Sequence, residues 1–102
     1  MRSRFSAYAL GLVDYILATT HPDGPHFKHD AAAWSAEVQA FSAGTRFRSL
    51  DILDTGSDGD TGFVDFRAGL EQGGRDASFR ERSTFELREG RWLYRDGAPR
   101  SA

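Results

Sequence analysis

The sequence predicts an α+β domain in which two N-terminal helices pack into a curved, four-stranded antiparallel sheet. Up to Gly44 the apolar residues recur with a period of about 3.6, which indicates amphipathic helices, and beyond Gly44 the period falls to about 2, which indicates strands. Turn clusters rich in Gly, Asp and Ser separate the strands, so strands that are consecutive in sequence should be neighbours in the sheet. Such a layout forms a cone that often encloses a pocket.

The first predicted helix covers Ser3 to Thr19. Its apolar sector spans more than half of the circumference, as expected for a helix enclosed by a curved sheet. The large residues of this sector are Phe5, Tyr8, Leu12, Tyr15 and Ile16. The segment from His21 to His29 contains Pro22, Gly24 and Pro25, which cannot continue a helix, so a loop should follow.

A second, shorter helix is predicted over Ala31 to Ala43. Asp30 stands where an N-cap residue is expected, and the segment behind it is rich in strong helix formers. Gly44 stands where a left-handed C-cap is expected.

Four strands should follow the helices. The predicted strands are Arg46 to Leu53, Gly62 to Leu70, Ala77 to Arg88 and Arg91 to Arg95. Gly73-Gly74 and Glu89-Gly90 are predicted to form tight turns. In the third strand, alternation places Phe79, Glu81, Ser83, Phe85 and Leu87 on one face. The other face is polar, so the first should face the helices and carry Glu81 and Ser83 inward.

Composition excludes several classes of function. The net charge of -2 argues against nucleic-acid binding, and the absence of Cys removes thiolate chemistry. The basic start and the apolar stretch to Ala18 have the outline of a signal peptide, but Asp14 interrupts that stretch. We therefore expect a cytoplasmic, single-domain chain over residues 1–102 that neither enters a membrane nor binds nucleic acid.

The only cluster of potential metal ligands lies in the loop. His21, His26 and His29 fall within ten residues, together with Asp23 and Asp30. Their spacing does not put two ligands on one helix face, and the Pro-Gly loop does not preorganise them. We therefore expect no metal site and no cofactor.

The sequence resembles the central domain of YchJ-like proteins over nearly the whole chain. The matching residues are Met1-Arg2-Ser3-Arg4 with Ala7, Asp14-Tyr15, Thr19 with His21-Pro22, Gly62-Phe63-Val64 with Phe66, Gly73-Gly74, Glu81-Arg82-Ser83 with Phe85, and Gly90, Trp92, Tyr94, Asp96 and Gly97. The resemblance implies a cone-shaped, nuclear-transport-factor-2-like (cystatin-like) fold. It also implies flanking Cys-rich metal-binding motifs, which this chain lacks. The resemblance implies no established reaction.

Glu81 is the strongest candidate for a functional group. A carboxylate on an apolar face is costly unless it is paired or protonated. One interpretation makes Glu81 a general base or ligand acceptor that is oriented by Ser83. The other pairs Glu81 with Arg2 or Arg4 as a structural ion pair. The further pocket candidates are Tyr15, His21, Trp34 and Trp92.

The favoured function is binding of a small ligand or a partner protein in or near the cone, without catalysis. The alternative is an acid-base enzyme that acts on a small apolar substrate with Glu81 as base. We also expect a homodimer through the outer face of the sheet, where residues of the second strand could leave an apolar patch ringed by Arg67, Arg80 and Arg82.

Overall fold

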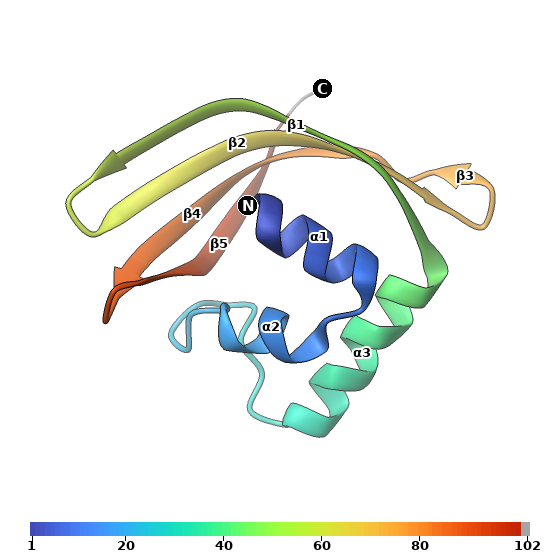
Figure 1. Cartoon of the computed structure of the whole chain (residues 1–102), viewed down its shortest axis with the longest axis horizontal. Coiled ribbons are helices and arrows are strands. Elements are labelled where there is room, and N and C mark those ends of the chain that lie inside the picture. The colour runs from blue at the N-terminus through green and yellow to red at the C-terminus, as the bar shows by residue number, and fades with distance from the viewer. Residues whose placement is uncertain (101–102) are drawn as a thin grey trace.

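The computed structural model describes residues 1–100 as three helices and an antiparallel sheet (Figure 1). The elements are α1 (Arg2–Leu10), α2 (Val13–Ala18), α3 (Ala31–Gly44), β1 (Thr45–Asp58), β2 (Thr61–Gln72), β3 (Arg75–Asp76), β4 (Phe79–Arg88) and β5 (Arg91–Arg100). Within residues 1–100, no helix combines the length and the hydropathy needed to cross a bilayer.

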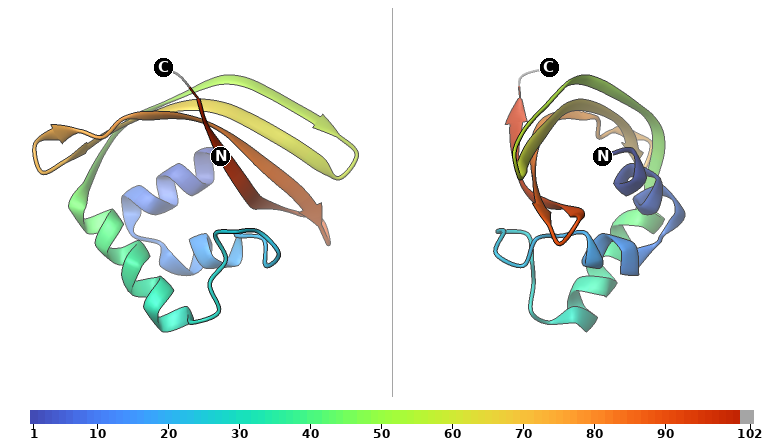
Figure 2. Two further views of the ribbon diagram at one scale, coloured as in Figure 1. Left: turned by 180° about the vertical axis from the view of Figure 1, so that it is seen from behind. Right: turned by 60° about the vertical axis from the view of Figure 1, so that its left-hand side comes forward.

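The sheet arches over the helices, which all lie on its concave side (Figures 1 and 2). The long strands follow the order β1-β2-β4-β5, and the short β3 pairs with β2. Every long pairing is antiparallel between strands that neighbour each other in sequence, apart from the interposed β3. The predicted α+β class and the predicted strand order are confirmed.

The single helix predicted for Ser3 to Thr19 is wrong, because the chain breaks into α1 and α2 at Gly11. Gly11 adopts a left-handed conformation with φ of 70°, and its N–H bonds back to the end of α1. The N–H of Leu12 then reaches the carbonyl of Ala7 at 2.8 Å. Glycine adopts this conformation without a steric penalty, so the chain can turn here and start a second helix.

The ends of α3 differ in how well the sequence predicts them. Asp30 caps the helix as predicted, since its Oδ1 accepts from the N–H of Ala33 at 3.0 Å. Gly44 is not a left-handed cap. It is the last helical residue, and Thr45 is already extended with φ of -123°, so α3 leads into β1 without a loop.

The long strands begin within two residues of the predicted positions, and β1, β2 and β5 run further than predicted. β1 continues to Asp58 and pairs with β2 along its whole length, although Gly56 and Ser57 read as turn residues. The predicted turns are confirmed, with left-handed residues at Gly73, Gly74, Glu89 and Gly90. On β4, Ser83 and Phe85 are buried, so the predicted inward face is also confirmed.

Apart from Phe85 and Tyr94, the buried apolar residues among residues 1–100 form two separate clusters. One belongs to the helices and consists of Ala7, Val13, Ile16, Trp34 and Val38. The other lies on the concave face of the sheet and consists of Phe66, Ala68 and Leu70, with partly buried neighbours that include Phe5 and Phe47. The core is therefore divided between the helical layer and the sheet.

Arg4 joins the helices to each other at the centre of the fold. Its side chain is 7% exposed, and Nη1 donates to Oγ1 of Thr19 at 2.7 Å and to the carbonyl of Ile16 at 3.3 Å. The guanidinium carbon lies 4.6 Å from the ring centre of Tyr94. Within residues 1–100, Arg4 forms no ion pair, so neutral oxygens and aromatic rings hold a buried cation.

The outer face of the sheet carries an ion-paired cluster within the chain. Asp65, whose side chain is 3% exposed, accepts from Nε of Arg80 at 3.1 Å and from Nη2 of Arg82 at 3.3 Å. The guanidinium of Arg82 also lies 4.4 Å from the ring centre of Phe63. The Asp65 carboxylate is thus bound by two arginines of its own chain. The dimer itself stays a prediction.

We expect Arg4→Met to lower the free energy of unfolding by about 1.5–3 kcal/mol, because hydrogen bonds from a buried charged donor are lost. Urea denaturation monitored by circular dichroism measures this loss. Arg2→Met is the matched control, since Arg2 is exposed on the same helix. Equal stability of the two variants would contradict the central role of Arg4.

We expect Asp65→Asn to destabilise the domain at neutral pH but not in strong acid. The hydrogen bond from Arg80, with Arg82 adding, holds the pKa of Asp65 below its ordinary value. Such a carboxylate stabilises the fold above its unfolded pKa, and the stabilisation disappears as pH falls through the folded pKa. Urea midpoints of wild type and variant should therefore converge towards pH of about 2. Asp51→Asn serves as the control, because Asp51 lies on β1 and is exposed.

Candidate functional site

A cavity of about 540 Å³ separates the two core clusters; we call it the inner cavity. Its floor is the concave face of β2, where Phe66, Ala68 and Leu70 line it, and its opposite wall includes Trp34 and Val38 of α3. The residues that would close a continuous core instead face a space large enough for a small molecule.

Aromatic rings form one side of the inner cavity. Tyr8 of α1 meets Phe41 of α3 edge to face at 5.5 Å, and Phe41 meets Phe47 of β1 in the same way at 5.8 Å. Phe41 and Phe79 remain 37% and 42% exposed although they are large and apolar. Both line the inner cavity, so part of their exposed surface faces this space.

Glu81 provides the carboxylate of the inner cavity. Its Oε2 accepts from Oγ of Ser83 at 2.7 Å and from Oη of Tyr94 at 3.5 Å. Within residues 1–100, Oε1 has no hydrogen-bond partner of its own. Gly97 makes this arrangement possible, because a methyl group at that position would overlap Cδ of Glu81 and Oη of Tyr94.

Two phenols accompany the carboxylate. Burial, together with the charge of Glu81, raises the pKa of the Tyr94 hydroxyl far above its ordinary value. Burial likewise raises the pKa of Tyr8. Both hydroxyls therefore stay protonated at neutral pH and can donate hydrogen bonds. The Tyr94 hydroxyl donates to Glu81.

Charged side chains lie at the opening of the inner cavity. Lys28, from the loop before α3, forms an ion pair with Glu37 of α3, and both line the cavity. His26 also lines it and lies 3.6 Å from Asp96. These exposed pairs contribute little to stability, but they make the entrance polar.

The structure separates the predicted pocket residues into different places. Trp34 and Glu81 line the inner cavity, and Ser83 lies fully buried beside Glu81. Tyr15 and Trp92 line a different space of about 640 Å³, which we call the hairpin cleft because the β1–β2 and β4–β5 hairpins form much of its wall. The pocket candidates predicted from the sequence therefore lie in two separate spaces and do not form a single pocket.

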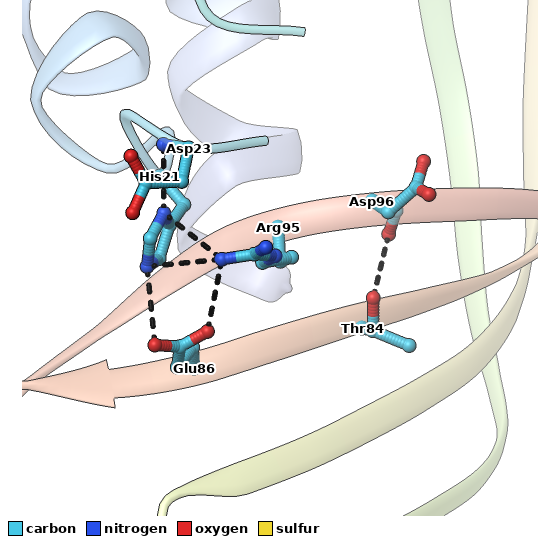
Figure 3. A network of polar contacts seen from close by, with 6 residues as sticks. All are labelled: His21, Asp23, Thr84, Glu86, Arg95 and Asp96. Atoms are coloured by element: carbon cyan, nitrogen blue, oxygen red, sulfur yellow. Dashed lines mark hydrogen bonds and ion pairs between the residues drawn. The ribbon is translucent and has the colours of Figure 1, made fainter. Parts of the chain in front are cut away.

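His21 lies outside both spaces, on the edge of β5. Its N–H donates to the carbonyl of Tyr94 at 2.8 Å, so residues 19–21 extend the sheet by one parallel bridge. The N–H of Asp23 donates to Nδ1 of His21 at 3.0 Å, which places the ring proton on Nε2, 3.2 Å from Oε1 of Glu86 (Figure 3). Arg95 contacts both His21 and Glu86. His21 therefore fastens the loop to the sheet.

The ion pair expected between Glu81 and Arg2 or Arg4 does not form, so this interpretation of Glu81 is corrected. Glu81 bonds to Ser83 and Tyr94, and Arg4 bonds to the end of α2. Within residues 1–100, no ion pair joins these groups. The break at Gly11 explains the difference, because it brings the carbonyl of Ile16 and the hydroxyl of Thr19 to Arg4.

Sequence reasoning missed Tyr8 and Tyr94 as polar groups of the inner cavity. A usable signal existed for Tyr94, since it shares the inward face of β5 with Trp92, two residues before it. No comparable signal marked Tyr8, because its apolar spacing is that of a core residue.

The three histidines of the loop do not converge. His21 contacts Glu86, His26 contacts Asp96, and His29 packs its ring on Phe27. In the part of the chain that the structure describes, no three His, Asp or Glu side chains are grouped so as to hold a metal ion.

The helices in the concavity of a bent antiparallel sheet, with a cavity between them, define a domain of the nuclear-transport-factor-2-like class. The chain belongs to the YchJ family: the model of the YchJ middle NTF2-like domain matches residues 1–97.

Curated relatives agree with this assignment. The chain is 39% identical over 101 residues to a UPF0225 protein of Sodalis glossinidius, a match that covers 95% of this chain and 62% of the relative. It is 38% identical over 104 residues to a UPF0225 protein of Chromobacterium violaceum, covering 95% and 69%. The chain thus spans only part of the length of these relatives.

Solved structures share the fold. A SEC-C motif containing protein from Rhodopseudomonas palustris superposes with a TM-score of 0.83 at 33% identity, over 99% of this chain and 76% of that one. An LEH-like epoxide hydrolase from M. tuberculosis superposes with a TM-score of 0.62 at 20% identity, over 90% and 74%. The second likeness concerns the fold alone.

We expect Gly97→Ala to destabilise the domain by about 1–3 kcal/mol, because the added methyl group overlaps Glu81 and Tyr94. The double variant Gly97→Ala/Glu81→Ala should lose less stability than the sum of the single variants. Thermal melts measure both effects. Gly44→Ala is the control, since a methyl group there meets no atom within 4 Å. Strict additivity would show that Glu81 does not lie over Gly97.

Proposed function

We propose that the domain is a cytoplasmic binding module that takes a small, largely apolar molecule with one hydrogen-bond donor into the inner cavity. The observation that carries the proposal is the divided core. Apolar side chains of α3 and β2 face a space of about 540 Å³ instead of each other, and one carboxylate, Glu81, lies in its wall. Ligand sites are commonly apolar with a few placed polar groups.

The polar groups define the ligand further. Oε1 of Glu81 can accept one hydrogen bond, and the protonated hydroxyl of Tyr8 can donate one. The hydroxyl of Tyr94 already donates to Oε2 of Glu81, so it can only accept a hydrogen bond from a ligand. A neutral hydroxyl or amine next to Glu81 satisfies this set. An anion would meet the charge of Glu81 in a space of low polarity, which is unfavourable.

The alternative is an acid-base enzyme that acts on a small apolar substrate. The carboxylate of Glu81 beside the phenol of Tyr94 favours it, since a base and a proton donor then face one space. The mass of any molecule that copurifies separates the two proposals. A mass unchanged after prolonged incubation with the protein supports binding alone, and a converted mass supports catalysis.

We expect the neutral fluorescent amine N-phenyl-1-naphthylamine to bind saturably, with enhanced emission in the apolar cavity. Ala68→Leu should weaken this binding about tenfold or more, because Ala68 forms part of the cavity floor. Ala98→Leu makes the same chemical change on exposed β5 and should leave binding unchanged.

The hydrogen bond to Glu81 has its own test. Glu81→Met should weaken binding of N-phenyl-1-naphthylamine more than binding of 1-phenylnaphthalene, which lacks the N–H donor.

If Ala68→Leu and Ala98→Leu bind the amine equally well, the inner cavity is not the site.

A further inference from the structure

A second space, the hairpin cleft, lies on the other side of Arg4. Arg4 lines both the inner cavity and the hairpin cleft, and so lies between them. The two spaces differ in charge. The inner cavity contains Glu81 and Glu37, whereas within residues 1–100 no Asp or Glu lines the hairpin cleft.

The hairpin cleft offers positive charge and hydroxyl groups instead. Arg91, at the start of β5, lines it together with Arg4. Oη of Tyr15 donates to Oγ of Ser3 at 2.7 Å on the side formed by α1 and α2. Arginines and hydroxyls without a competing carboxylate form a surface suited to an anion.

Arg4 adds the strongest argument. It is 7% exposed and has no ion pair within residues 1–100, and a buried charge without a counter-ion is costly. Burial also lowers the pKa of Arg4. An anion in the inner cavity would meet Glu81, but an anion in the hairpin cleft would balance Arg4 without such repulsion.

Gly62 leaves room for an aromatic wall in the same cleft. A Cβ at Gly62 would lie 3.4 Å from the indole of Trp92. The indole therefore lies close against β2. Trp92 is nevertheless 44% exposed, which leaves part of the indole uncovered beside the cleft. An uncovered indole is a good surface on which to stack a planar ring.

We propose that the hairpin cleft binds a small aromatic carboxylate, whose ring stacks on Trp92 and whose carboxylate is held by Arg4 and Arg91. The volume of about 640 Å³ accommodates a one-ring or two-ring molecule. This site uses residues that the inner cavity does not, apart from Met1 and Arg4, which line both. It therefore stands independently of the function proposed above.

Each site has its own fluorescent reporter, because Trp34 lines the inner cavity and Trp92 the hairpin cleft. The experiment titrates 4-nitrobenzoate, a quencher, into Trp34→Phe, in which Trp92 is the remaining tryptophan. We expect saturable quenching. The neutral 4-nitrobenzamide should bind at least about fivefold more weakly, because it lacks the charge that the arginines recognise.

Arg91→Gln in the Trp34→Phe background should weaken 4-nitrobenzoate binding at least about fivefold. Arg88→Gln is the matched control, since Arg88 is exposed at the end of β4 and does not line the cleft. Equal affinity for acid and amide, equal effects of the two arginine variants, or no saturation at millimolar ligand would each overturn the proposal. Saturable quenching of Trp34 in the Trp92→Phe variant, together with no quenching of Trp92 in the Trp34→Phe variant, would also overturn it.

Discussion

The hydrogen bonds of the Arg4 guanidinium fix how the helices meet the sheet. A buried cation needs several acceptors, and here they come from the end of α2, which can reach Arg4 only because the chain reverses at Gly11. The same reversal delivers residues 19–21 to the edge of β5. One left-handed glycine and one arginine thus set the position of α2, of the following loop and of the last strand.

The divided core follows from this arrangement. With α1 held by Arg4 and α3 running directly into β1, the helical cluster around Trp34 cannot settle onto the floor formed by Phe66 and Ala68. Interiors are normally closely packed, so a persistent gap lowers stability unless something fills it. The domain tolerates this cost at the place where Glu81 and Tyr94 supply hydrogen-bonding groups, as sites for ligands typically do.

Sequence patterns predicted what depends on local periodicity and not what depends on distant partners. The alternation along β4 correctly carried Glu81 and Ser83 inward, because side chains on a strand alternate regardless of context. The division of the first helix was missed because the apolar spacing continues across Gly11. The partners of Arg4 and His21 could not be predicted, since they depend on how the elements pack. For the same reason, the sequence could not show that the pocket candidates Tyr15 and Trp92 line a different space from Trp34 and Glu81.

The attachment of His21 to the sheet also constrains the order in which the chain can fold. The ring of His21 contacts Arg95, 74 positions further along the chain, and its backbone bonds to Tyr94. Contacts of such large sequence separation form late, because the intervening chain must first be ordered. During synthesis the helical part of the domain, which ends at Gly44, emerges before the sheet but acquires its anchor only when β5 has left the ribosome. Until then its apolar surfaces have no sheet to cover them, and a nascent chain in this state depends on its surroundings to avoid association.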